Sequence, residues 1–378
     1  MENAERLPDV QKSESGKENT NGIRRLVAVS VSVFLASLAI LVAGSLNTAF
    51  AEGYCNTVSA FLRAVLGAAS SLVPFSLAET LVVLAPVAFL LLLARAVIKN
   101  FAFKIKGSIR RFILRAFCLV LLLLSMFIQT FGICYKRKSA AELFALDTAS
   151  LTDRDIYISA ALSLHLAERE CDSLIYAPNG MSKMPYDFDT LRQRVKDGYD
   201  SFLATPPVLS IKPVALSEPW TYTHISGMYM PLTGESNLNV NYPDYMVAYT
   251  TCHEAAHQLG VAYESEANFF AFLACMHSED AYLRYAGALN LFEYLLSDLD
   301  AESAVRLYSS LDGRITGELR AYSAFFDKYR TSKAAKVSDA VNDTYLKSQG
   351  IAAGTKNYSE VTRLAAAYFK KYLPQYYT

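Results

Sequence analysis

The sequence predicts three N-terminal transmembrane helices followed by a mostly α, α+β extracytoplasmic domain. Hydrophobic residues make up 52% of the 378 residues and charged residues only 19%, which is typical of a chain with membrane segments. Three long apolar runs lie within the first 135 residues, and residues 136–378 have the mixed composition of a folded domain. The formal net charge is zero, so no basic field indicates a nucleic-acid partner.

The first apolar run predicts a membrane helix over residues 24–48. Residues 1–23 are polar and are expected to form a disordered cytoplasmic tail. Arg24 and Arg25 are followed by an uncharged run that is long enough to span a bilayer. A cleaved signal peptide is the alternative, because Ala49-Phe50-Ala51 resembles a cleavage site. The further spans favour a retained anchor.

Two more spans follow an extracytoplasmic loop, residues 49–76. Phe61 and Val65 lie at helical spacing in this loop and predict an amphipathic helix on the membrane surface. Residues 77–98 form the second expected span, in which a membrane helix tolerates Pro86. Residues 112–135 form the third.

The loop between the second and third spans, residues 99–111, is basic and predicts the orientation. Positive charges favour the cytoplasmic side, so this loop and the N-terminal tail are expected there. Three spans then leave residues 136–378 outside the cytoplasmic membrane. Lys136, Arg137 and Lys138 oppose this orientation but are outnumbered by the charges at the loop: Lys99, Lys104, Lys106, Arg110, Arg111 and Arg115.

Helical periodicity dominates residues 136–378, with a short strand region in the middle. Pro206-Pro207 ends one expected helix, and Asn357-Tyr358 begins the cap of the last. Strand pieces are expected at 208–211, 214–216 and 221–231, followed by a turn at 233–235. The expected helices are 155–175, 188–203, 245–259, 264–276, 281–296, 301–311, 315–328, 332–347 and 360–372.

The stretch around His253-Glu254-Ala255-Ala256-His257 carries the chemistry. On a helix, His253 and His257 lie four residues apart and leave from one face, so that both imidazoles reach a common metal ion. Glu254 sits about 100° further round the helix, where it reaches a metal-bound water without binding the metal. This H-E-x-x-H pattern is typical of zinc hydrolases. An amphipathic helix with two surface histidines is the alternative interpretation.

A zinc ion needs a third protein ligand, for which Glu264 is the first candidate. A turn at Gly260 folds the chain back, and Asn268 shares a helix face with Glu264 as a supporting residue. Glu266 is the rival and lies about 200° round the helix from Glu264, so the two cannot both face the metal. Lesser ligand candidates are His224 and His277.

The expected cofactor is one zinc ion per chain, and the expected catalytic residue is Glu254. Zinc polarises a carbonyl and acidifies water, and Glu254 takes the proton of that water and delivers it to the leaving amine. A strand at residues 227–230 is expected to line the cleft and pair with an extended peptide. Oxyanion candidates are Tyr222, His224 and Tyr229, for each of which structural packing is the alternative role.

The six cysteines show no C-x-x-C spacing, which argues against a cysteine zinc site. Cys252 and Cys275 flank the metal motif, and the sequence leaves a bridge between them open. Cys118 lies in an apolar run and is expected to be a small buried residue.

The motif resembles that of the gluzincin-type zinc peptidases. In several of these groups the H-E-x-x-H motif is followed by a ligand glutamate with Asp or Asn four residues later, as in Glu264-Ser265-Glu266-Ala267-Asn268 here. The resemblance implies Glu264 rather than Glu266 as the third ligand. Only six residues separate His257 from Glu264, fewer than in most of those groups, and this departure keeps both glutamates in consideration.

The chain also resembles a bacterial membrane family of unknown function, domain-of-unknown-function family 3810. The likeness covers most of residues 24–370, including Pro74-Phe75-Ser76, residues 226–235, the metal motif through Ala274-Cys275, and residues 341–347. It implies three spans followed by a zincin-like domain and says little about function.

Together these observations predict a membrane-anchored zinc metallopeptidase that acts on a peptide or protein substrate outside the cytoplasmic membrane. The lipid bilayer is its other expected partner, and no nucleic acid is expected. A zinc hydrolase of another amide, such as a cell-wall peptide, is one alternative. A membrane sensor or scaffold with a structural metal is the other.

Overall fold

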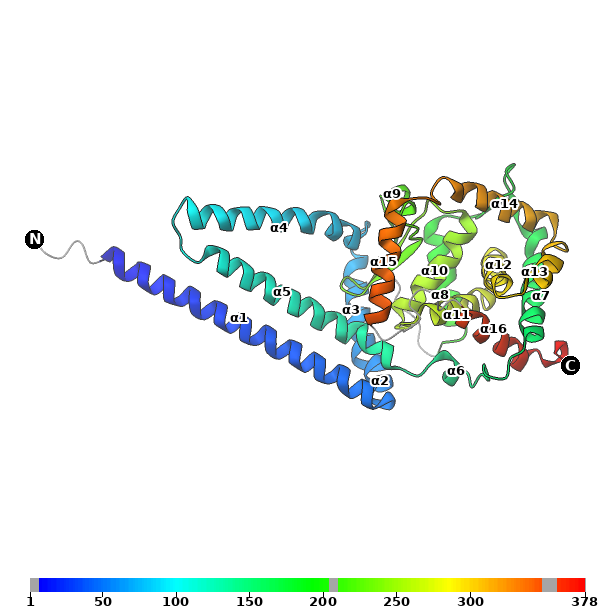
Figure 1. The fold of residues 1–378 in the computed structure, drawn as a ribbon, viewed down its shortest axis with the longest axis horizontal. Coiled ribbons are helices and arrows are strands. Elements are labelled where there is room, and N and C mark those ends of the chain that lie inside the picture. The colour runs from blue at the N-terminus through cyan, green and yellow to red at the C-terminus, as the bar shows by residue number, and fades with distance from the viewer. Residues whose placement is uncertain (1–6, 204–209, 349–358, 378) are drawn as a thin grey trace, which may run out of the picture.

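The computed structural model describes residues 7–203, 210–348 and 359–377. Three long helices, α1 (Leu7–Leu46), α4 (Leu77–Phe101) and α5 (Ser108–Thr130), lie side by side and extend from one end of a helical domain (Figure 1). The N-terminus and the α4–α5 turn lie at the far end of this bundle.

Each of the three helices contains a segment long and apolar enough to cross a membrane: Asn21–Leu46, Leu77–Phe101 and Ser108–Thr130. Their outward faces expose large apolar side chains, for example Leu90 at 62% and Leu91 at 67%. Such a surface is unfavourable in water and suits a lipid environment. The prediction of three apolar helices of spanning length is therefore confirmed.

The bounds of all three long helices differ from the expectation. Helix α4 continues to Phe101 and α5 begins at Ser108, so the expected loop 99–111 is shorter. Helix α1 begins at Leu7, so residues 7–23, expected to be disordered, are helical. Glu, Lys and Gln in this stretch are good helix formers, and the apolar helix that follows provides a nucleus to extend. The third span ends at Thr130, and Gly132–Lys136 form a short 3₁₀ helix, η2, instead of its last turn. Residues 1–6 lie outside the described residues.

The loop between the first two spans is helical and lies at the junction with the domain. It contains α2 (Thr48–Tyr54), a π-helical turn η1 (Cys55–Ser59) and α3 (Ala60–Ser71). The expected amphipathic helix is present: Phe61 and Val65 are exposed on one face, while Arg63 and Gly67 are buried on the other. The buried face packs against the domain, so α3 connects the membrane helices to the domain.

The domain core consists of α10 (Asp244–Gln258), α11 (Glu264–Met276) and α12 (Ala281–Ser297), packed with α7 (Asp153–Glu170) and α16 (Ser359–Tyr372). The remaining helices of the described domain lie around this core: α6 (Ala140–Leu143), η3 (Cys171–Ser173), α8 (Phe188–Asp200), α9 (Ser217–Thr221), α13 (Ala301–Tyr308), α14 (Gly313–Asp327), α15 (Lys333–Ser348) and η5 (Pro374–Tyr376).

A three-stranded sheet packs beside α10 in the order β3-β5-β4. Strand β3 (Ile211–Pro213) pairs parallel with β5 (Glu235–Leu238), and β4 (Gly227–Met230) pairs antiparallel with β5. A separate hairpin joins β1 (Ile175–Tyr176) and β2 (Ser182–Lys183). Strand β4 therefore lies at one edge of this sheet.

The strand region differs most from the sequence-based expectation. Residues 217–221 form helix α9, only residues 227–230 of the expected strand 221–231 are extended, and residues 214–216 form no strand. The helix expected over 155–175 ends at Glu170, before β1. The expected features at 206–209 and at Asn357-Tyr358 lie outside the described residues.

Candidate metal centre

The H-E-x-x-H motif lies on the last two turns of α10, and a sharp turn brings α11 back against it. Gly260, with φ of 91°, adopts a left-handed conformation that favours glycine and ends the helix as expected. Glu264 is the first residue of α11, also as expected. The turn therefore places a carboxylate opposite the helix face that carries both histidines.

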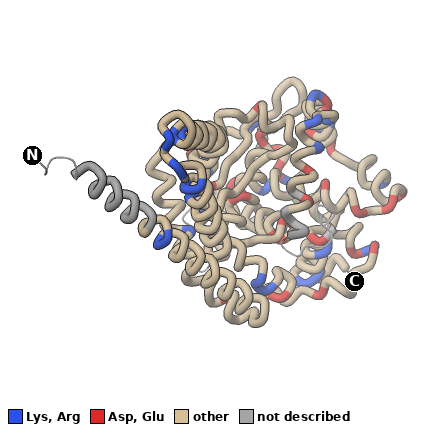
Figure 2. The backbone as a smooth tube through the Cα atoms, turned by 60° about the vertical axis from the view of Figure 1, so that its left-hand side comes forward, with Lys and Arg blue, Asp and Glu red and all other residues tan. Residues whose placement is uncertain are grey.

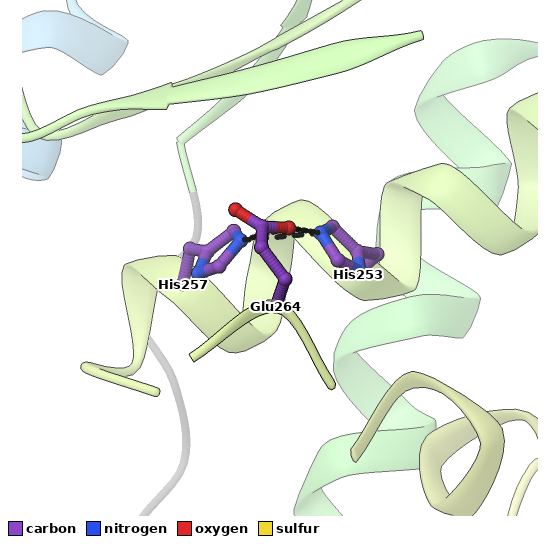
Figure 3. Close-up of side chains that lie close together, drawn as sticks. All are labelled: His253, His257 and Glu264. Atoms are coloured by element: carbon purple, nitrogen blue, oxygen red, sulfur yellow. Dashed lines mark hydrogen bonds and ion pairs between the residues drawn. The ribbon is translucent and has the colours of Figure 1, made fainter. Parts of the chain in front are cut away.

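Three ligand atoms converge at this point, and Figure 3 shows the imidazoles of His253 and His257 facing the Glu264 carboxylate. The two Nε2 atoms lie 3.1 Å apart, and Glu264 Oε2 lies 3.1 Å from His253 Nε2 and 3.5 Å from His257 Nε2. Ligands on a tetrahedral zinc at 2.0–2.1 Å are separated by about 3.3 Å. The described donor set therefore fits a zinc ion.

The opposite nitrogens of the two rings fix their tautomers. Nδ1 of His257 lies 2.7 Å from the carbonyl oxygen of Val261, which only accepts hydrogen bonds. Nδ1 of His253 lies 2.8 Å from Oδ1 of Asn268. With both Nδ1 atoms donating, the Nε2 lone pairs point toward each other and toward a carboxylate. These Nδ1 hydrogen bonds hold the two imidazoles with Nε2 free to bind a cation. Hydrogen bonds to the non-ligating ring nitrogen have the same role in zinc sites.

The electrostatics of the centre also favour a positive charge. Burial lowers the pKa of His257, but the charge and hydrogen bond of Glu264, the charge of Glu254 and the Val261 carbonyl together outweigh it and raise that pKa to about 9. Burial raises the pKa of Glu264, but the two histidines outweigh it and hold that pKa well below its usual range. The cluster thus attracts a cation, whether a proton or a metal ion.

Glu254 lies beside the cluster and is buried, with 4% of its surface exposed. Burial raises its pKa, against the opposing influence of His253 and His257. Among the described residues its Oε2 has no hydrogen-bond partner. A buried, unpartnered carboxylate oxygen of raised pKa is suited to accept a proton.

Strand β4 lies directly over Glu254. A side chain at Gly227 would place its Cβ 2.7 Å from Glu254 Oε1 and 2.8 Å from Thr250 Cγ2. Glycine is therefore what permits the strand to approach the helix this closely. Residues 227–230 thus form a strand beside the motif, as expected, and its pairing with a peptide stays a prediction.

The other candidates lie away from the cluster, except Tyr229, which is on β4 beside the motif. Glu266 accepts a hydrogen bond from the Ala140 backbone at 2.7 Å, and burial raises its pKa to about 7. His224 binds the carbonyl of Tyr329 at 2.9 Å. The remaining candidates pack in aromatic contacts: Tyr222 on Tyr329, Tyr229 on Phe131, and His277 on Phe202. Among the described residues, the only cluster with metal-ligand geometry is His253, His257 and Glu264.

Two partners of the centre were not found from the sequence. The contact of the Val261 carbonyl with His257 cannot be predicted from residue types, because any residue has a backbone carbonyl. The turn expected at Gly260 indicated only that the backbone folds back near the motif. Arg63 on α3 donates from Nε to the carbonyl of Gln258 at 3.1 Å and from Nη2 to that of Leu259 at 3.1 Å. The only sequence feature that could have indicated this contact is the presence of a single arginine, Arg63, within an otherwise apolar helix.

The structure thus defines a protein with three helices of membrane-spanning length, a mostly helical domain, and a His-His-Glu cluster between α10 and α11. The chain belongs to the family described as "Protein of unknown function (DUF3810)", whose model matches residues 54–366. This agrees with the likeness seen in the sequence. No curated protein and no solved structure matches the chain.

Proposed function

We propose that this protein is a membrane-anchored zinc metallopeptidase with a zincin-like catalytic domain outside the cytoplasmic membrane. The observation that supports this most is the convergence of His253, His257 and Glu264 beside the unpartnered carboxylate of Glu254. Structural zinc sites are usually closed by four protein ligands, whereas catalytic sites use three and keep one position open. Three ligands with an adjacent buried base match the catalytic type.

A zinc ion held by these three residues would polarise the scissile carbonyl and lower the pKa of a water molecule. Glu254 would accept the proton of that water through its free Oε2 and pass it to the leaving amine. Asn268 and the Val261 carbonyl would keep both imidazoles in the tautomer that presents Nε2.

The edge of β4 provides a place for an extended substrate. Strand β4 pairs with β5 on one side, and no strand pairs with its other side among the described residues. A peptide added to this edge would run above α10, next to Glu254. This arrangement favours a peptide over a compact amide as substrate.

The charge distribution supports an extracytoplasmic domain. Figure 2 shows Lys and Arg at the tip of the α4–α5 hairpin, which lies at the same end of the bundle as the N-terminus. Positive charges favour the cytoplasmic side, and the domain is at the opposite end. A periplasm-active and a cytoplasm-active reporter fused in turn to Thr378 would test this, because activity of the cytoplasmic reporter alone would contradict it.

Hydrolysis tests the proposal. Full-length protein purified in detergent should cleave unfolded protein or a peptide pool, and Glu254→Gln should keep its metal while losing roughly 10²–10⁴-fold in rate, as expected for a general base. Glu293→Gln is the matched control, since Glu293 also has a raised pKa but lies outside the site. Zinc-loaded wild-type protein that cleaves no peptide, including cell-wall peptides, would contradict the proposal.

A further inference from the structure

Two cysteines meet where the membrane helices join the domain. Cys55 begins the π-helical turn after α2, and Cys134 lies in η2 after α5. Both are free and buried, and they are close enough for each thiol to shift the pKa of the other. They belong to a small apolar cluster separate from the domain core. A dithiol pair is thus present at the point through which the membrane helices contact the domain.

A buried cation lies against one member of the pair. Arg63 Nη1 lies 3.4 Å from Cys134 Sγ, and Ser59 Oγ lies 3.9 Å from it. The Arg63 guanidinium forms no ion pair with a carboxylate of the described residues; its partners are carbonyls, Ser59 and Cys134. Arg137 is already paired with Glu52 at 3.1 Å. A thiolate at Cys134 would therefore balance the Arg63 charge.

The electrostatics distinguish the two thiols. The neighbouring Cys55 thiol, with Arg63 and Arg137 nearby, outweighs burial and lowers the pKa of Cys134. The neighbouring Cys134, together with burial, raises the pKa of Cys55. Cys134, which also lies against the Arg63 guanidinium, is thus the nucleophile of the pair, and Cys55 is the second thiol.

Small molecules can approach only one of the two sulfurs through the adjacent cavity. A cavity of about 710 Å³ lies between α3 and the domain, and Cys134, Arg63 and Thr57 are among its lining residues. Cys55 is fully buried and is not part of the lining. An incoming molecule therefore meets Cys134 first, with Cys55 behind it.

We propose that Cys55 and Cys134 are a redox-active dithiol that a small disulfide of the glutathione class oxidises. The Cys134 thiolate attacks one sulfur of the disulfide, forms a mixed disulfide and releases one thiolate. Cys55 then loses its proton and attacks Sγ of Cys134, which expels the second thiolate and forms the Cys55–Cys134 bond. The protein loses two electrons, and the small disulfide is reduced to two thiols.

The reduced form of this pair is stabilised by Arg63, so its disulfide should be easily reduced. A disulfide whose thiolate product is stabilised is a stronger oxidant than a structural disulfide. The pair Cys252–Cys275, with Sγ atoms 3.5 Å apart, lies in the domain core without a cation partner among the described residues. Burial and the neighbouring thiol raise the pKa of Cys275. This second pair is expected to stay reduced and unreactive while the protein is folded.

Peptide mapping of the purified full-length protein tests the site. Reduced protein in detergent is incubated with oxidised glutathione, quenched in acid, alkylated and analysed by mass spectrometry. A cross-link between the peptides of Cys55 and Cys134 is expected, and reduced glutathione should reverse it. Persistence of both thiols, or alkylation of Cys252 and Cys275 as rapid as that of Cys134, would overturn the proposal.

Two variants test the order of the steps. Cys55→Ser should stop at one glutathione on Cys134, while Cys134→Ser should leave Cys55 unmodified. Cys118→Ser, a buried cysteine in α5, is the matched control and should cross-link like the wild type. Modification of Cys55 in the Cys134→Ser protein at the wild-type rate would overturn the assignment. The dithiol proposal does not depend on the proposed hydrolase activity, so a result that contradicts one proposal does not contradict the other.

Discussion

Replacing Arg63 with alanine should weaken the junction between the membrane helices and the domain. The guanidinium is buried and donates to carbonyl oxygens at the ends of three helices. Thr130 is the last residue of α5, Gln258 is the last residue of α10, and Cys55 follows the end of α2. Carbonyls at helix C-termini lack an intrahelical donor, and a cation there also offsets the helix dipole.

The expected loss follows from the number of acceptors left behind. Arg63→Ala leaves the carbonyls of Gln258 and Leu259 without their donors at 3.1 Å, whereas the Thr130 carbonyl keeps the Ser59 hydroxyl at 2.7 Å. Each buried acceptor left without a donor costs about 1–3 kcal/mol, and water from the adjacent cavity offsets part of this, so we expect roughly 2–5 kcal/mol in total. For a domain of this size, that corresponds to a fall in apparent Tm of roughly 4–20 °C.

Thermal unfolding of the detergent-purified protein, followed by circular dichroism, measures this change. Arg63→Lys should fall between alanine and the wild type, because one ammonium cannot replace a planar group with five N–H donors. Arg306→Ala is the control: its ion pair with Glu302 is exposed, so its loss should cost less than about 1 kcal/mol. An Arg63→Ala protein that melts within about 2 °C of the wild type would refute the reasoning.

Three further predictions concern the site and the core. Gly227→Ala would place a Cβ 2.7 Å from the Glu254 carboxylate, so hydrolysis should fall by roughly 10²-fold with zinc content unchanged; a wild-type rate would contradict this. Asn268→Ala removes the acceptor for His253 Nδ1 and should weaken zinc binding by roughly 10–100-fold in a chelator competition; an unchanged affinity would argue against its orienting role. Burial raises the pKa of Glu293 to about 7, so the carboxyl stabilises the folded protein at pH 5 and this stabilisation is lost as the pH rises through about 7. The apparent Tm of Glu293→Gln should therefore fall less than that of the wild type between pH 5 and pH 8. An equal fall in the two proteins would exclude titration of Glu293 as the cause.

The local parts of the site could be predicted from the sequence. The placement of His253 and His257 on one helix face depends only on helix geometry. Helix α11 begins at Glu264 as expected, because Gly260 allows the sharp turn and acidic residues suit the first turn of a helix. The expected support from Asn268 also depends on spacing within one helix, and the structure shows the contact.

Strand β5 could not be predicted because its sequence is polar where a buried strand is normally apolar. Glu235 is fully buried and pairs with Lys212 on β3 at 2.9 Å, and its neighbour Asn237 binds the carbonyl of Met228 at 3.1 Å. Burial of such residues depends on partners from other strands, which satisfy their charges and hydrogen bonds. The sequence of β5 therefore shows no alternation of apolar and polar residues from which a strand could be predicted.

The same limit applies to the contacts between distant segments. Arg63 is 195 residues from Gln258, and Cys55 is 79 residues from Cys134. Spacing along the chain identified α3 as amphipathic but could not show which surface its polar face would meet. The packing of α3 against the domain supplied that information.

Zinc content tests the central claim most directly. Wild-type protein, Glu264→Gln and Glu266→Gln would be purified in parallel, equilibrated with zinc, passed through a desalting column and measured by inductively coupled plasma mass spectrometry. We predict about one zinc per chain in the wild type and in Glu266→Gln, and a large loss in Glu264→Gln. A wild-type protein without zinc, or a Glu264→Gln protein that keeps its full content, would contradict the account.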